Sequence, residues 1–138
     1  MSIKTEKALE LHKKGYNCAQ AVVCAFAEDC GVPEEEAFRI AEGFGFGMGM
    51  MEMCGAVSGM SMVIGLTNSV GNLEKGKPTK ADTYQKVRTY AEKFRDKNGS
   101  YLCRELKGAG TGNVLCTCDQ CIADAARMTE EYLKERQK

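Results

Sequence analysis

The chain has 138 residues, with nineteen acidic and nineteen basic side chains that leave no formal net charge. This length fits one domain over residues 1–138, with a hydrophobic core large enough to be stable without disulfides or metals. Because the charges cancel and form no long run of one sign, the composition argues against nucleic acid or an anionic membrane surface as a partner.

Eight cysteines are more than a domain of this size needs for stability. Disulfide-dense scaffolds are shorter, secreted and rich in loops, whereas this chain lacks an apolar signal segment and has the pattern of long helices. Its longest apolar stretch, Met53–Leu66, has about 14 residues, short of the roughly 20 that cross a bilayer. We therefore expect a protein of the reducing cytoplasm, without membrane insertion.

The first part of the chain predicts three helices with recognisable ends. Gly15 and Gly31 follow the first two helices as C-terminal glycines, and Pro33 opens the third, where three glutamates complement the helix dipole. Apolar residues recur at the helical period in the second helix, so the stripe that includes Cys18 should face the core. The predicted spans are 4–14, 18–30 and the residues from 33 onward.

The next segment, 43–50, has the sequence GFGFGMGM, with glycine at every second position. A strand would lose stability at each glycine, so we predict a loop whose backbone approaches another group closely. Such a loop would act as a flexible lid or a packing joint over Cys54. A phosphate-binding loop is disfavoured, because no strand precedes the segment and no lysine follows it.

A run with almost no charge predicts a central helix at about 53–69 that is buried on all sides. The other helices would wrap it and place Cys54 near the centre of the molecule. Six methionines lie between 48 and 62, and we expect them to fill an irregular core, with Cu(I) binding as the less favoured alternative.

The second half of the chain continues the helical pattern. A polar connection at 72–78 is the best candidate for a mobile surface loop, and an amphipathic helix follows from 79 until Gly99 stops it. A short segment from Cys103 precedes the last helix, at about 118–136. No strand or repeat is evident, so we predict an all-α, single-domain bundle of about five to six helices around the central one.

Helix geometry divides the cysteines into groups. Cys18, Cys24 and Cys30 are spaced six residues apart, so they point about 120° away from one another and cannot share one site. Cys18, on the core stripe, is the candidate for a shared site. Cys24 and Cys30 are expected to be packing thiols.

The run CTCDQC places Cys116, Cys118 and Cys121 at the start of the last helix, where the latter two can face one point. Such a run favours a metal ion or a disulfide, but zinc sites usually have a second cysteine pair, which is missing here. The only histidine, His12, lies among lysines and should be solvated, which argues against catalytic zinc and against a cysteine–histidine hydrolase. The metal alternative would draw on Cys18, Cys54, Cys103, Cys116, Cys118 and Cys121.

The most informative local signature is CGAVSG, from Cys54 to Gly59, at the start of the central helix. Unpaired backbone N–H groups and the helix dipole stabilise a thiolate there, so we predict a lowered pKa and a reactive thiol at Cys54. Gly55 and Gly59 have no side chains and would let another backbone or a bound group approach the sulfur. In the alternative interpretation the glycines serve helix packing and Cys54 is a small core residue.

Several motifs in this order resemble the C_GCAxxG_C_C family of redox-active proteins: GYNCAQAV, GFGFGMGM, CGAVSG, LCRELKG and the alanine-rich start CIADAA of the last helix. The resemblance covers nearly the whole chain. It implies a small prokaryotic protein with an unknown redox partner, associated with a transporter in some relatives. It also implies that the family's functional positions are Cys18, Cys54, Gly55, Ala56, Gly59, Cys103 and Cys121.

We therefore predict a redox protein that uses reversible dithiol/disulfide exchange or electron transfer, which allows a thiol–disulfide oxidoreductase. In this prediction Cys54 is the attacking thiolate, Cys18 is its resolving partner, and Cys103 with Cys121 forms a second pair or a reservoir. One alternative is a metal-binding module that holds an iron–sulfur cluster or zinc through the same cysteines. Another is a structural helical adaptor with inert thiols. Formation of a homo-oligomer is compatible with the sequence.

Overall fold

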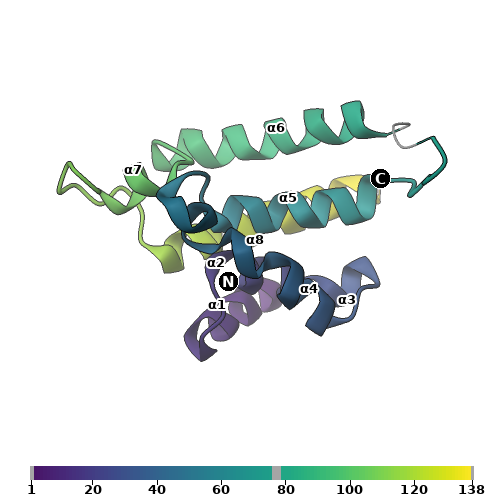
Figure 1. Cartoon of the computed structure of the whole chain (residues 1–138), viewed down its shortest axis with the longest axis horizontal. Coiled ribbons are helices and arrows are strands. Elements are labelled where there is room, and N and C mark those ends of the chain that lie inside the picture. The colour runs from purple at the N-terminus through teal and green to yellow at the C-terminus, as the bar shows by residue number, and fades with distance from the viewer. Residues whose placement is uncertain (1, 76–78, 138) are drawn as a thin grey trace.

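The computed structural model describes residues 2–75 and 79–137, and these residues are all-α (Figure 1). They form eight α-helices: α1 (Ile3–Lys14), α2 (Cys18–Ala25), α3 (Ala27–Cys30), α4 (Glu34–Ala41), α5 (Gly55–Asn68), α6 (Lys80–Asn98), α7 (Cys103–Lys107) and α8 (Cys118–Arg136). The only β-type pairing in the described part is an isolated bridge between Met53 and Leu102. The predicted all-α class is confirmed, with more and shorter helices than the five or six expected.

Local capping defines the first helices, with one departure from the prediction. Asn17 begins α2 in a capping box, in which its side chain and that of Gln20 satisfy each other's backbone N–H groups. The single helix predicted over 18–30 is broken at Phe26, where φ is −111° and ψ is 8°. Phe26 is fully buried at this break, so tertiary packing outweighs the local helical period.

The glycine-rich segment 43–50 is not a strand, as predicted. It begins in a 3₁₀ turn at Glu42–Phe44 and continues as an irregular turn over Gly47–Met51, in which the dihedral angles of Met48 and Gly49 are not helical. Three bulky residues have φ between 55° and 60°, a left-handed conformation that such side chains rarely adopt: Phe46, Met48 and Met51. A Cβ atom at Gly47 would lie 2.9 Å from Cys103 Cβ. The close backbone approach predicted for this segment is therefore present, as a packing joint against α7.

The predicted central helix is α5, which packs on α2, α8 and α6. In Figure 1 it lies between α6 on one side and α1 to α4 on the other. Val57, Met60 and Ile64 are almost completely buried, but Leu66 is 45% exposed. The prediction of burial on all sides is therefore wrong near the end of α5, because its neighbours leave one edge uncovered.

The last helices follow the predicted spans closely. α6 ends at Gly99, whose φ of 88° suits a glycine, and α8 has the predicted bounds. Of the surface connection predicted at 72–78, residues 76–78 lie outside the described residues. None of the helices in the described ranges is both long and apolar enough to span a membrane.

Candidate functional site

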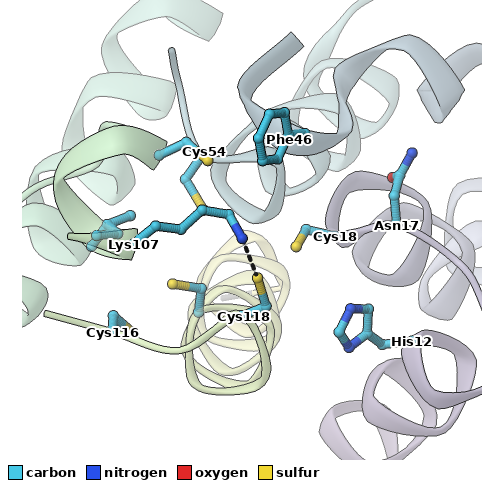
Figure 2. A pocket seen from close by; sticks show the side chains of 12 residues that line it. His12, Asn17, Cys18, Phe46, Cys54, Lys107, Cys116 and Cys118 are labelled. Carbon is cyan, nitrogen blue, oxygen red and sulfur yellow. Dashed lines mark hydrogen bonds between the residues drawn. The ribbon is translucent and has the colours of Figure 1, made fainter. Parts of the chain in front are cut away.

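Four helices begin with a cysteine at the same cavity (Figure 2). Cys54 is the N-cap of α5, and Cys18, Cys103 and Cys118 are the first residues of α2, α7 and α8. Helix N-termini present unpaired N–H groups and partial positive charge. These four helix starts surround a cavity of about 170 Å³.

Backbone hydrogen bonds hold two of these helix starts together. The N–H of Cys54 donates to the carbonyl oxygen of Tyr101 at 2.8 Å, and the N–H of Cys103 donates to the carbonyl oxygen of Glu52 at 2.6 Å. These two bonds join the segment that precedes α5 to the segment that precedes α7. Residues separated by about a third of the chain are thereby fixed at one wall of the cavity.

Six of the eight cysteines line this cavity: Cys18, Cys54, Cys103, Cys116, Cys118 and Cys121. All eight cysteines are free thiols. The other two lie elsewhere, as helix geometry predicted: Cys24 is buried with its thiol directed at the carbonyl of Glu34, and Cys30 is half-buried on α3. Burial raises the pKa of each of these two thiols to about 11, consistent with packing roles.

The lowered pKa predicted for Cys54 is present in the structure. A hydrogen bond from the Cys121 thiol is its largest cause. Burial opposes it, but the backbone N–H groups of Ala56 and Val57 and the positive charge of Lys107 bring the pKa of Cys54 down to about 7. The fold therefore favours the thiolate of Cys54 relative to an ordinary cysteine.

The remaining thiols form contacts that the sequence did not specify. Cys121 hydrogen-bonds to both Cys54 and Cys116, and the contact with Cys54 raises the pKa of Cys121 far above its ordinary value. Cys18 is hydrogen-bonded to Cys118, and burial together with the nearby Cys118 and Cys54 sulfurs strongly raises its pKa. The predicted pairings of Cys18 with Cys54 and of Cys103 with Cys121 stay predictions, between thiols of one cavity.

The thiols of the cavity fall into two groups that differ in burial. Cys54 and Cys121 are only 5% and 3% exposed, and Cys103 and Cys116 are buried as well. Cys18 and Cys118 are only partly buried. In Figure 2 the Cys18 and Cys118 side chains point toward each other across the cavity.

Lys107 is the site residue that the sequence analysis missed. Its Nζ donates to Cys118 Sγ at 3.4 Å and lies 5.5 Å from the centre of the Phe46 ring (Figure 2). Burial lowers the pKa of Lys107, but the neighbouring Cys118 raises it by more. The net pKa is therefore above its ordinary value, and the amine stays protonated. The only available signal was its spacing, one helical turn after Cys103.

His12 also lines the cavity, with its side chain 28% exposed. Its Nδ1 is 2.9 Å from Oδ1 of Asp119, at the start of α8. The packing of α1 against α8 makes this contact, which joins residues far apart in the sequence.

The glycines of the CGAVSG motif allow α2 to approach α5. A Cβ atom at Gly55 would lie 3.2 Å from Cys18 Cβ, and one at Gly59 would lie 2.8 Å from the carbonyl oxygen of Ala19. Any side chain at Gly59 would therefore push the two helices apart. The glycines serve helix packing, and this packing brings Cys18 to the cavity that holds Cys54.

Within residues 2–75 and 79–137, no group of three or more His, Cys, Asp or Glu side chains is arranged to hold a metal ion. A family model described as "Putative redox-active protein (C_GCAxxG_C_C)" matches residues 16–132 of the chain. This match includes all six cysteines of the cavity. No curated protein and no solved structure matches the chain.

Proposed function

The chain belongs to the C_GCAxxG_C_C family of redox-active proteins, and from this premise we propose that it carries out reversible dithiol/disulfide exchange at Cys54. The observation that carries the proposal is the contact of Cys54, whose pKa is lowered to about 7, with the thiol of Cys121. A thiol with a pKa near the ambient pH is the most effective nucleophile in such exchange.

The exchange needs two thiols and a disulfide substrate. The Cys54 thiolate attacks one sulfur of the substrate disulfide, which forms a mixed disulfide and releases the first substrate sulfur as a thiolate. Cys121 then attacks Cys54 Sγ, which forms the Cys54–Cys121 disulfide and releases the second substrate sulfur as a thiol with the proton of Cys121. The substrate gains two electrons and the protein loses two.

Cys121 replaces Cys18 as our choice of resolving thiol for this step. The sequence favoured Cys18 because both it and Cys54 were expected at helix starts. The hydrogen bond between Cys54 and Cys121 supports Cys121, since the resolving sulfur must reach Cys54 Sγ directly.

The test is a thiol count on anaerobically purified protein, before and after one equivalent of a small disulfide. We expect the reversible loss of two thiols, with Cys54–Cys121 as the final bridge in peptide mapping. The Cys24→Ser variant is the matched control, because Cys24 is buried outside the cavity, and it should give the same bridge. An unchanged thiol count, or a final bridge without Cys54, would refute the proposal.

A second candidate function is the binding of zinc or an iron–sulfur cluster, for which the six thiols around one cavity would supply the sulfur ligands, although no three of the described side chains are placed to hold a metal ion together. Iron, zinc and acid-labile sulfide are measured on the same anaerobic protein. About one ion or cluster per chain, lost in both the Cys54→Ser and the Cys103→Ser variants, would replace the exchange proposal with this one.

A further inference from the structure

We propose that the cavity holds two dithiol pairs that react one after the other. The outer pair, Cys18 and Cys118, exchanges with a disulfide of a partner protein. The inner pair, Cys54 and Cys121, is oxidised last. This inference rests on the proposed exchange function and names the partner class and the entry point. It assigns a role to Cys118, which lies outside the cysteine pattern that the sequence resembles.

Exposure separates the two pairs. The inner thiols are 5% and 3% exposed, so the chain covers them almost completely. Both outer thiols are partly exposed at the same cavity. A cavity of about 170 Å³ can admit a small disulfide, but a disulfide within a protein carries its backbone with it and can reach only the outer sulfurs.

Lys107 is suited to support the outer pair. Its ammonium group donates a hydrogen bond to Cys118 Sγ at 3.4 Å (Figure 2). An ammonium group at this distance stabilises the negative charge that develops on Cys118 Sγ when this sulfur attacks or leaves. Lys107 is therefore a positioning residue for Cys118.

Cys18 links the two pairs. It is hydrogen-bonded to Cys118 on one side and lies close enough to Cys54 for their charges to interact on the other. The absence of a side chain at Gly55 keeps this approach short, because a Cβ atom there would lie 3.2 Å from Cys18 Cβ. Cys54 can therefore reach a disulfide that contains Cys18.

The relay balances without any reagent besides the partner disulfide. The Cys118 thiolate attacks that disulfide and releases one partner thiolate; Cys18 then attacks Cys118 Sγ and releases the second partner sulfur with the proton of Cys18. The Cys54 thiolate attacks Cys18 Sγ and releases the Cys118 thiolate. Finally Cys121 attacks Cys54 Sγ, and Cys18 leaves as a thiol with the proton of Cys121.

The test compares two probes on the reduced full-length protein: insulin, a protein disulfide, and bis(2-hydroxyethyl) disulfide, a small one. We expect Cys118→Ser to slow the reduction of insulin by about tenfold or more and that of the small disulfide by less than about twofold. In an acid-quenched time course with limiting insulin, a Cys18–Cys118 bridge should precede the Cys54–Cys121 bridge. In the Cys54→Ser variant the outer bridge should accumulate.

Three further variants keep the result interpretable. Cys30→Ser is the matched control, because Cys30 is also a partly exposed thiol but lies outside the cavity, and it should react like the wild type. Lys107→Gln leaves every thiol in place and should slow the insulin reaction by about tenfold, since a hydrogen bond to a charged group contributes this much. It should slow the small-disulfide reaction less, because there the Lys107 charge assists only Cys54, without a hydrogen bond to its sulfur. Lys107→Arg should restore the rate.

The outcomes separate this inference from the proposed function. If the wild type reduces neither probe and forms no internal disulfide, the proposed function fails and the relay with it. If the wild type reduces both probes but Cys118→Ser slows them equally or not at all, the relay alone is refuted. Appearance of the inner bridge with no earlier outer bridge would also refute the relay.

Discussion

Cys54 has its chemistry because of contacts that exist only in the folded chain. The Cys121 thiol, the N–H groups of Ala56 and Val57, and the Lys107 ammonium all favour its thiolate. In an unfolded chain the same thiol would have its ordinary pKa of 9.0. Folding therefore creates the nucleophile, and two measurements at the residue scale follow from this.

The first is the pH dependence of alkylation. We expect the rate of Cys54 modification by iodoacetamide, followed by peptide mass spectrometry, to rise with a midpoint near pH 7, because the thiolate is the reactive form. Cys30 in the same sample is an internal control, with a midpoint near pH 11. Cys121→Ala should move the Cys54 midpoint upward, and a wild-type Cys54 midpoint at the ordinary thiol value would contradict the structure.

The second is the stability difference between the wild type and Cys54→Ser. The pKa of Cys54 is lowered from 9.0 to about 7 on folding, so its contribution is complete above pH 9 and is lost as the pH falls through 7. We expect the difference in the free energy of unfolding to increase by on the order of 2 kcal/mol between pH 7 and pH 9. Urea denaturation at several pH values measures it, and a flat difference would contradict this expectation.

At the scale of the elements, the crossing of α2 and α5 sets the geometry of the site. Gly59 lies where the carbonyl oxygen of Ala19 would be 2.8 Å from a Cβ atom, whereas Gly65 on the same helix has open space around it. One helix thus contains a glycine that packing requires and a glycine that packing does not require.

This contrast gives a matched pair of substitutions. Gly59→Ala should lower the free energy of unfolding by about 1–3 kcal/mol, because the added methyl group forces α2 and α5 apart. Gly65→Ala should raise it by up to about 1 kcal/mol, since alanine favours the helix and meets no neighbour. Urea denaturation of both variants decides the point, and equal effects of the two changes would show that the crossing is not tight.

For the molecule as a whole, the helices differ in how firmly they are held. Every residue of α2 from Ala19 to Ala25 is buried, whereas α6 packs mainly on α5 and α8 and buries few of its residues. One ion pair, Lys97 with Asp124 at 2.7 Å, helps to fix α6 to α8. Figure 1 shows α6 along the outside of the bundle.

We therefore expect α6 to open before the centre of the bundle does. Native-state hydrogen exchange should give the backbone amides of α6 a lower free energy of opening than those of α2 and α5, because α6 has less buried apolar surface to lose. Asp124→Asn should lower the α6 values further and leave those of α2 nearly unchanged. Equal protection in all three helices would contradict the expectation.

Features that depend on neighbouring residues could be predicted from the sequence. Helical periods gave the all-α class and the bounds of α8, and glycines such as Gly15 and Gly99 marked helix ends. The backbone N–H groups at the start of α5 supply part of the lowered pKa of Cys54, as predicted, and the six-residue spacing correctly separated Cys24 and Cys30 from the shared site. These properties arise within a few turns of one helix, where sequence spacing fixes direction.

Which side chains meet across helices became known from the folded structure and not from any local pattern. Cys18 and Cys118 are a hundred residues apart, and no local pattern specifies that α2 and α8 begin at the same cavity. The places of Lys107 and His12 depend on the same packing, as does the break at Phe26. The physical reason is that helix packing is set by the burial of many side chains together, so contacts between helices cannot be inferred from the period of any one of them.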